Sequence, residues 1–338
     1  MHFEEDLSLF IVFYLNRRCF IVESNSLAQE ELAVLQELKK VVGKIPYKGR
    51  IPYSDEDCYF STFEGHVTTL SLSNQGLATL PDDFGQLSAL KHLYIRRSKL
   101  KTLPESFYNI TALEEFSLFD NQFEDLPDGI GQLTSLINFN LGKNNLETLP
   151  ESICNLTSLE TLDLSENALR NLPESIDHLT NLKNLDVDNN YLDGLPTSFR
   201  NLSSLIILSL SHNELRDITE NIGQLSALER LNISKNSIDA LPESIGQLSL
   251  LKSLYAHKNL LTNLPESIGQ LANLEHLFLS NNKLMTLPES IGQLSALRDL
   301  SLDSNELSIS EGAKDALKIL LERGCTISGI PNFPESSP

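Results

Sequence analysis

The chain has 338 residues, a formal net charge of −20 at pH 7 and a pI near 4.7. Such an acidic composition argues against a nucleic-acid partner, because phosphate contacts require clustered lysine and arginine side chains. The four cysteines, Cys19, Cys58, Cys154 and Cys325, lie far apart and show no paired spacing. We therefore expect reduced thiols and a cytoplasmic protein.

An apolar run lies near the N-terminus, after an acidic stretch and before Arg17 and Arg18. A signal peptide would begin with positive charge, and a membrane-spanning helix would need about 20 apolar residues. The segment 7–22 instead favours a hairpin or short strand pair packed on the first copies of the repeat that begins at Val67. A membrane-associated N-terminus is the alternative, which the shortness of the run disfavours.

The segment 26–42 is predicted to form a helix. Ser26 and Gln29 have the spacing of a capping box, and Gly43 follows as a stop signal. Four apolar residues recur at spacings of three and four and share one face: Leu32, Leu35, Leu38 and Val42. With an irregular lead-in over 44–66, this helix completes an N-terminal cap over residues 1–66. A docking helix for a partner is the alternative.

From Val67 onward the chain repeats every 23 residues, with ten full copies in 67–296 and a partial eleventh that extends the array to 309. Positions 1, 4, 6, 11, 14, 18 and 21 of each copy are apolar, and position 15 is usually proline. Positions 4 and 6 have strand spacing, and proline followed by an acid suits the start of a short helix or 3₁₀ turn. Each copy is therefore predicted to form a strand, a turn and a helical return, whose apolar side chains are buried only by stacking.

Position 9 of the repeat is asparagine in nine successive copies. An amide side chain has both a donor and an acceptor, so stacked asparagines can satisfy the backbone groups of adjacent turns. Gln75 and Ser98 replace asparagine in the first two copies. We interpret the whole column as structural.

An acid occupies position 16 in nine of the ten full copies. These residues are Asp82, Glu105, Asp128, Glu151, Glu174, Glu220, Glu243, Glu266 and Glu289. Because they stand at predicted helix starts, where negative charge is stabilising, part of the net charge is architectural.

Residues 310–330 are predicted to cap the C-terminal end of the array. A helix is expected from Ser310 to the stop signal Gly324. Its inward face should carry Ala313, Leu317, Leu320 and Leu321. The tail, residues 331–338, is rich in proline and serine and is expected to be disordered.

The pattern LxxLxLxxNxLxxLPxxIxxLxx resembles the leucine-rich repeat in its 23-residue form, most closely the Ras-group class of intracellular proteins. Two copies depart from it: Ile218 and Thr219 replace Leu-Pro in the seventh, and Ala256 replaces leucine in the ninth. The resemblance implies an α/β solenoid, a curved array with a concave parallel sheet and helical N- and C-terminal caps. The class includes GTPase-linked scaffolds, so the resemblance also implies scaffolding or regulation of a small GTPase.

The positions that the repeat leaves free, 2, 3, 5, 7 and 8, should face out of the concave sheet. They form two patches rich in aromatic and arginine side chains, types that are enriched at interface hot spots. The N-terminal patch contains His92, Tyr94, Arg96, Arg97 and Phe119. The C-terminal patch contains Tyr255, His257, His276 and Phe278. Tyr255 and Phe278 hold the same position on adjacent strands and are expected to touch.

Between the patches lies an acidic centre of Asp163, Asp186 and Asp188, with Glu166 beside them. We interpret it as a strip that steers a partner with a basic surface; a Ca²⁺ site or an acid/base pair is the alternative. The chain lacks a calcium loop, a phosphate-binding glycine loop, HExxH, CxxC and a nucleophile elbow.

The sequence therefore predicts a monomeric, non-enzymatic scaffold without a cofactor, which binds a protein on its concave face. Two alternatives stay open. One is a regulator of a small GTPase signalling pathway, and the other is an exported or membrane-associated surface-recognition protein.

Overall fold

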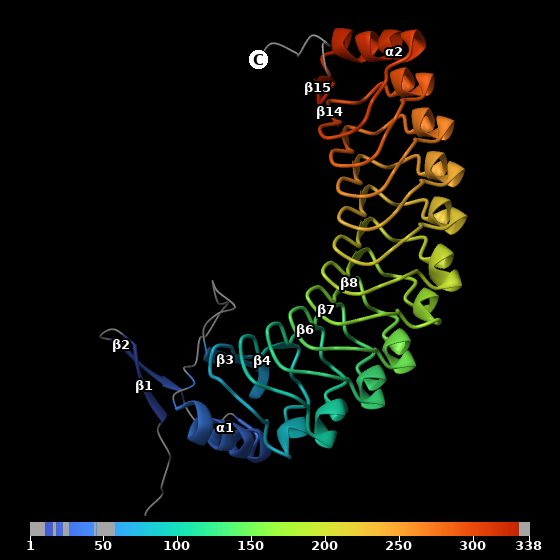
Figure 1. Ribbon diagram of the computed structural model, residues 1–338. Coiled ribbons are helices and arrows are strands. Elements are labelled where there is room, and N and C mark those ends of the chain that lie inside the picture. The colour runs from blue at the N-terminus through green and yellow to red at the C-terminus, as the bar shows by residue number, and fades with distance from the viewer. Residues whose placement is uncertain (1–10, 16–17, 23–26, 44, 46–57, 331–338) are drawn as a thin grey trace, which may run out of the picture.

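A computed structural model describes residues 11–15, 18–22, 27–43, 45 and 58–330. The repeats stack into an arc with the strands along its inner side and short 3₁₀ helices along its outer side (Figure 1). Helix α1, Gln29–Val42, lies at the N-terminal end and helix α2, Glu311–Glu322, at the C-terminal end. The predicted curved α/β solenoid with helical caps is confirmed.

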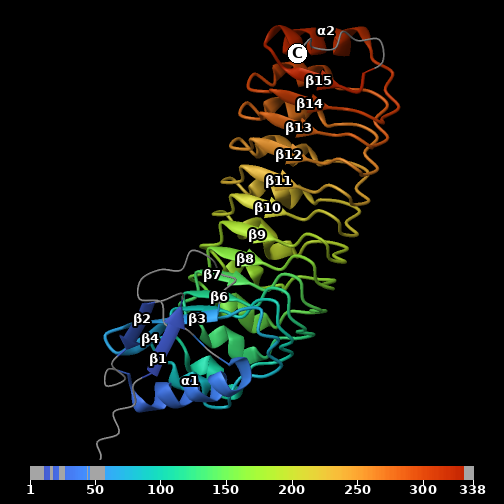
Figure 2. The same ribbon diagram turned by 90° about the vertical axis from the view of Figure 1, so that its left-hand side faces the viewer.

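One 13-stranded sheet lines the inner side, in the order of the sequence from β3 to β15 (Figure 2). Strands β3 and β4 are antiparallel, and every later pair is parallel and in register from one repeat to the next. The strands are β3 Cys58–Phe63, β4 His66–Leu72, β5 His92–Tyr94, β6 Glu115–Ser117, β7 Asn138–Asn140, β8 Thr161–Asp163, β9 Asn184–Asp186, β10 Ile207–Ser209, β11 Arg230–Asn232, β12 Ser253–Tyr255, β13 His276–Phe278, β14 Asp299–Ser301 and β15 Thr326–Ser328.

Each repeat returns along the outer side through a 3₁₀ helix. These helices are η2 Phe84–Gln86, η3 Glu105–Asn109, η4 Asp128–Gln132, η5 Glu151–Asn155, η6 Ile176–His178, η7 Thr197–Asn201, η8 Glu220–Gln224, η9 Glu243–Gln247, η10 Glu266–Gln270 and η11 Glu289–Gln293. Proline is the N-cap of most of them, one residue before the predicted helical position. In the departing seventh repeat, Thr219 takes over as N-cap, and Ile218 remains buried.

The asparagines of position 9 join neighbouring repeats. Asn167 donates from Nδ2 to the carbonyls of Leu141 and Leu164, each at 3.0 Å, and its Oδ1 accepts from the amide of Leu146 at 3.0 Å. Its neighbours in the column make the same bonds one repeat earlier and later. Each side chain thus bridges two turns, as expected, and all of them except Asn236 and Asn305 are buried. Ser98, in contrast, has a buried hydroxyl with no hydrogen-bond partner among the described residues.

Three acids of position 16 accept backbone hydrogen bonds from the next repeat. Glu220 accepts from the amide of Ser244 at 3.0 Å, and Glu243 accepts from the amide of Ser267 at 3.3 Å. The carboxylate of Glu151 does the same with Ser175, whose hydroxyl is the main cause of a lowered pKa for Glu151. These three acids therefore complement the helix start of the following repeat, whereas the sequence predicted that they complement the helix start of their own repeat.

On the outer side, position 19 of one repeat packs against position 17 of the next. A Cβ added to Gly246 would lie 2.6 Å from the carbonyl oxygen of Ser267, so glycine is required by the close stacking. Repeat 2 has Tyr108 at position 19 instead, and the next repeat has Gly129 at position 17, where a Cβ would lie 2.4 Å from the Tyr108 ring. The two unusual residues therefore compensate for each other.

The N-terminal cap differs from expectation in its details. Helix α1 begins at Gln29, with Ala28 as an N-cap that has no side-chain hydrogen bond, so the predicted start at Ser26 was wrong; Ser26 itself lies outside the described residues. The helix also buries Glu31, whose carboxylate accepts from the amide of Val67 at 3.0 Å and lies 3.2 Å from Nδ1 of His66. This carboxylate ties the cap to the first repeat.

The segments on either side of α1 contain further strands. Strands β1, Ile11–Leu15, and β2, Arg18–Val22, form an antiparallel pair, the arrangement that was expected for the segment 7–22. The expected irregular lead-in is wrong for its second half, where β3 extends the main sheet. Residues 46–57 of that lead-in lie outside the described residues.

The C-terminal cap follows α2 with one more strand. Ser310 caps the helix by accepting from the amide of Ala313 at 3.2 Å, and Ala313, Leu317 and Leu320 are buried as expected. Leu321 is only partly buried, and Ala316 takes its place in the core. Strand β15 was not predicted and adds the last strand of the sheet. The tail 331–338, expected to be disordered, lies outside the described residues.

The pairing of Tyr108 with Gly129 is testable by a double-mutant cycle. Gly129→Ser should destabilise the protein by about 1–3 kcal/mol, because the new side chain overlaps the Tyr108 ring. In a Tyr108→Gly background the same substitution should be nearly neutral, because it restores the glycine–serine stacking of the other repeats. Urea unfolding of the four proteins measures the coupling. An equal cost in both backgrounds would contradict the proposed compensation.

Candidate functional site

The short strands fix which side chains the concave face presents. Repeat position 4, in the middle of each short strand, is buried, whereas repeat positions 3 and 5 are at least partly accessible in most repeats. In β13, for example, Leu277 is buried between His276 and Phe278. Side chains at one position therefore form a column across neighbouring strands, about 4.8 Å apart. The concave face is a grid of such columns.

Position 8, just beyond the strands, has an unexpected backbone conformation. It has a positive φ in every repeat, from Asn74 at 61° to Ser304 at 58°, although no copy has glycine there. The left-handed conformation is least costly for glycine, asparagine and aspartate. Lys235 and Lys258 adopt it at φ 54° and 57°, so the backbone alone does not explain these lysines.

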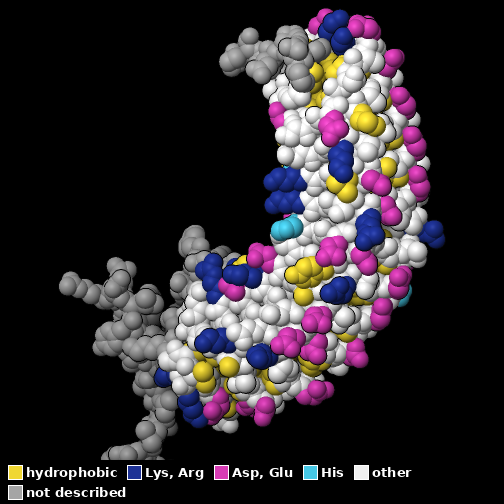
Figure 3. Space-filling view, viewed as in Figure 1, with side chains coloured by type: hydrophobic (Ala, Val, Ile, Leu, Met, Phe, Trp, Pro, Cys, Tyr) yellow, Lys and Arg dark blue, Asp and Glu magenta, His cyan; other side chains and the backbone are white. Residues whose placement is uncertain are grey.

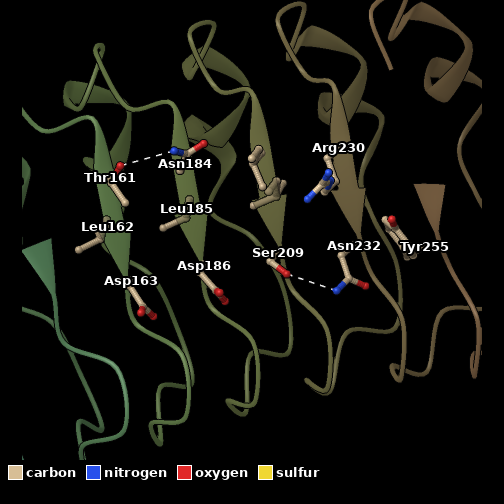
Figure 4. Close-up of a pocket in the computed structure, with 12 residues that line it drawn as sticks. Thr161, Leu162, Asp163, Asn184, Leu185, Asp186, Ser209, Arg230, Asn232 and Tyr255 are labelled. Atoms are coloured by element: carbon tan, nitrogen blue, oxygen red, sulfur yellow. Dashed lines mark hydrogen bonds between the residues drawn. The ribbon is translucent and has the colours of Figure 1, made fainter. Parts of the chain in front are cut away.

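A hollow of about 480 Å³ lies in the middle of the concave face, across β8 to β12 (Figure 4). Asp163 and Asp186 lie side by side at one end, and Arg230 and Tyr255 line the other end. Its remaining lining residues are Thr161, Leu162, Asn184, Leu185, Ile207, Leu208, Ser209 and Asn232. The hollow therefore has an acidic end and an end with a cation and an aromatic ring.

The carboxylates of the acidic end are held in place by their own turns. Asp163 accepts from Asn140 Nδ2 at 2.7 Å and from the hydroxyl of Ser165 at 2.6 Å. Asp186 accepts from the amide of Asp188 at 2.9 Å. Burial raises the pKa of Asp186 to about 6, and the charges of Asp188 and Asp163 add to the shift. The site thus keeps partly buried carboxylates close together, at a cost in stability.

Asp188 belongs to the same cluster but lies two residues beyond the end of β9. Its carboxylate accepts from the hydroxyl of Ser209 at 2.8 Å and from the amide of Ser211. Burial raises its pKa, against the lowering effect of those two bonds. Asp188 therefore supports the turns of the next repeat, while Asp163 and Asp186 line the hollow.

The aromatic side chains of the C-terminal patch are stacked. The rings of Tyr255 and Phe278 have centroids 5.1 Å apart at 18° to each other, so the expected contact is present. His276 lies parallel to Phe278 at 6.2 Å, and its Nδ1 is 2.7 Å from a carboxylate oxygen of Asp299. These partly exposed rings form a flat shelf on β12 and β13.

The N-terminal patch is a separate, internally bonded cluster. The guanidinium of Arg96 lies 5.2 Å from the centre of the Tyr94 ring and donates to the hydroxyl of Ser117 at 2.8 Å. Tyr94 donates to Glu115, and His92 is 3.5 Å from the same carboxylate. Phe119 and the exposed Arg97 come from the turns of the same two repeats. None of the five lines the hollow.

Comparisons with known proteins bear on the identity of this fold. A family model described as a leucine-rich repeat region matches residues 138–237 and 212–322, and a second, leucine-rich repeat, matches residues 65–123. The chain belongs to the leucine-rich repeat family. A leucine-rich repeat protein of Leptospira interrogans is 35% identical, with a TM-score of 0.70 over 77% of this chain and 72% of that one.

Two solved structures of lower sequence identity have a similar fold. A TDR receptor is 29% identical with a TM-score of 0.69, over 79% of this chain and 47% of its own. The plant peptide hormone receptor RGFR1, solved in complex with RGF2, is 27% identical with a TM-score of 0.61, over 83% of this chain and 49% of its own. The chain thus spans about half the length of these two receptors. No curated protein matches it.

Leucine-rich repeat proteins are generally interaction modules. Metal-binding groups, membrane-spanning helices and thiols are features separate from that general role. No group of three or more metal-binding side chains lies together among the described residues. In the same residues, no helix is long and apolar enough to cross a membrane. Cys154 and Cys325 are buried free thiols. The side chain of Cys19 is not described.

The structure brings only some of the predicted site residues together. Asp163, Asp186 and Tyr255 share the hollow, His276 and Phe278 extend its aromatic end, and the N-terminal patch lies apart. Arg230 and Asn232 were missed, although both belong to columns that the repeat leaves free. A reading of position 3 across the array would have found Arg230. The partner-binding role of all these residues stays a prediction.

The raised pKa of Asp186 predicts a specific pH profile. Because the folded protein holds this proton more tightly than the unfolded chain, stability should fall as the pH rises from about 4 to 6, and the penalty should persist above pH 6. Asp186→Asn should therefore stabilise the protein by about 1 kcal/mol at pH 7.5, after allowance for solvent screening, and by little at pH 4. Urea unfolding at both pH values measures the gain.

Asp217→Asn provides a matched control, because Asp217 is an exposed acid outside the concave strands. It should leave the pH profile of stability unchanged. A gain for Asp186→Asn that is the same at both pH values would show that the cost of Asp186 is unrelated to its charge.

Proposed function

We propose that this leucine-rich repeat chain is a protein-interaction module that binds a protein partner on its concave face. The observation that carries the proposal is the hollow across β8 to β12, which has carboxylates on β8 and β9 and Arg230 and Tyr255 on β11 and β12. On such a surface, the aromatic side chain provides an anchoring contact for a partner, and the charged side chains determine how the partner is oriented. Two neighbours of similar fold are described in complexes with RGF2 and CASPARIAN STRIP INTEGRITY FACTOR 2, which supports a binding role.

The proposed mechanism is presentation by a rigid surface. Because the repeats are joined by buried asparagines and by close glycine–serine stacking, the side chains of the concave face are held before a partner arrives. Little conformational freedom is then lost on binding, which favours affinity. Asp163 and Asp186 receive a basic group of the partner, and the Tyr255–Phe278 shelf covers an apolar one.

The loss of stability that ionised Asp186 causes is a further support for binding on the concave face. A partly buried carboxylate with a raised pKa is less stable than a neutral side chain of the same shape. Such residues concentrate where function needs them. The acidic end of the hollow therefore favours a cationic group as the ligand at this point of the surface.

A cytoplasmic location and regulation of a small GTPase are the finer parts of the proposal. Both come from the sequence: the first rests on cysteines that lie far apart without paired spacing, and the second on the resemblance to the Ras-group class. The GTPase hypothesis has its own test, because it requires binding that depends on the bound nucleotide of the GTPase. Equal capture of the GDP and GTP forms would contradict it.

The concave face can be tested with matched variants. Affinity capture from a native lysate should retain a protein with the wild-type chain and lose most of it with Asp186→Asn/Tyr255→Ala. Tyr191→Ala is the control, because Tyr191 is half exposed but lies outside the concave strands. It should capture as much as the wild type.

The single variant Asp186→Asn is included to separate binding from folding, because this substitution is expected to stabilise the chain. Reduced capture by Asp186→Asn alone could therefore not result from unfolding. If all three variants retain the same proteins in the same amounts, the binding surface lies elsewhere, and α1 of the N-terminal cap becomes the leading candidate.

A further inference from the structure

The cations beside the concave strands fall into two groups, paired and unpaired. At position 2, an acid of one repeat forms an ion pair with a base of the next repeat or the one before. These pairs are Lys91–Glu114, Lys183–Glu160, Lys252–Glu229 and Arg298–Glu275, at 2.7 to 3.2 Å. Lys143 of position 8 is likewise paired with Asp120 at 3.0 Å.

Three exposed cations toward the C-terminal end have no such partner. Within the described residues, no ion pair joins Arg230, Lys235 or Lys258 to an acid. Figure 3 shows lysine and arginine side chains gathered beside a histidine on the inner rim of the arc. On a chain with a net charge of −20, a group of cations without ion pairs among the described residues is a local exception.

These cations lie on both sides of the aromatic shelf. Arg230 at position 3 lines the hollow with Tyr255, whereas Lys235 and Lys258 stand at position 8, beyond the other end of the strands. His257 lies between the shelf and the lysines; burial lowers its pKa, and the charges of Lys258 and Lys235 add to this. The positive charge of this region therefore comes from the lysines and the arginine.

The backbone gives no reason for lysine at these two positions. Their column contains Asn189 and Asn281 in the same left-handed conformation, which asparagine adopts more readily. Two lysines side by side also repel each other unless an anion lies between them. Charge and conformation thus both point to an anionic ligand at this place.

We propose that Tyr255, Phe278, Arg230, Lys235 and Lys258 form an aromatic–cation patch that binds a protein segment carrying carboxylates beside an aromatic side chain. The proposal rests on the concave-face function and adds the chemistry of one part of the partner. The aromatic side chain stacks on the shelf, and the carboxylates pair with the cations on either side. Repulsion from the rest of this acidic chain is screened beyond about 10 Å at 0.1 M salt, so the local cations decide the contact.

The acidic end of the hollow lies next to the patch and sets its boundary. Asp188 is near enough to Lys235 to feel its charge, but its oxygen is bonded to Ser209 and Ser211. A carboxylate of the partner is therefore directed toward β11 to β13 and away from β8 and β9. The patch consequently selects the orientation of the bound segment as well as its composition.

The test uses fluorescence anisotropy with a short labelled peptide of alternating glutamate and tyrosine, and a reference peptide of alternating glutamine and tyrosine. The wild-type chain should bind the glutamate peptide more tightly than the reference. Lys235→Asn/Lys258→Asn removes both charges and keeps a side chain suited to the backbone, and it should weaken binding by about tenfold. Tyr255→Ala should weaken the binding of both peptides.

Lys101→Asn/Lys283→Asn is the matched control, because it removes the same charge from exposed lysines outside the strands. It should bind the glutamate peptide like the wild type. The proposal is overturned if the peptide does not bind, if both lysine pairs weaken it equally, or if the reference peptide binds as well. Tighter binding of a lysine–tyrosine peptide would overturn the proposal in favour of a cationic partner. A dimer of the wild-type chain that is lost only in Lys235→Asn/Lys258→Asn would overturn it in favour of a second copy of the chain.

The outcome is separable from that of the capture experiment. Capture of a protein that depends on Asp186 and Tyr255 but not on Lys235 and Lys258 would support binding on the concave face. It would overturn the proposal that the bound segment carries carboxylates beside an aromatic side chain. A captured protein that needs none of these residues would remove the basis for both proposals.

Discussion

The structure depends on the contact between one repeat and the next. A single copy cannot bury its seven apolar positions, so its strand, turn and 3₁₀ helix are stable only when neighbours cover them. The buried asparagines make that contact specific, because each bonds the turns of two repeats at once. On the outer side, glycine and serine set how closely the helices approach. The inner and outer spacings together determine the curvature and hence the concave face.

The same stacking explains why the ends of the array are different. A repeat without a neighbour exposes an apolar face, and here α1 and α2 cover the two faces. The carboxylate of Glu31 satisfies an amide of the first repeat, and Gly292 allows close approach of Ala316 in α2. Strands β3 and β15, which lie outside the ten full repeats, form the two edges of the sheet. The caps are therefore extensions of the repeat contact, made with other elements.

The sequence predicted the periodic part of this architecture well, because every repeat position has one environment that recurs ten times. It predicted the contact of Tyr255 with Phe278 for the same reason, since equal positions on adjacent strands must be neighbours. It failed where a residue occurs once. The start of α1, the buried Glu31 and strand β15 depend on tertiary contacts that no local pattern reports. The left-handed backbone at position 8 was also hidden, because its residues vary freely and none is glycine.

The concave face shows how a rigid repeat acquires function. Within the repeat, charges are usually neutralised by their neighbours, as in the ion pairs of position 2. Departures from that balance are costly: Asp186 has a raised pKa, and Lys235 and Lys258 occupy a backbone conformation that suits asparagine better. Both departures lie within a few strands of the Tyr255–Phe278 shelf. Neither the partly buried carboxylate nor the two lysines stabilise the fold. Their position beside the Tyr255–Phe278 shelf is best explained by a ligand that supplies the opposite charges.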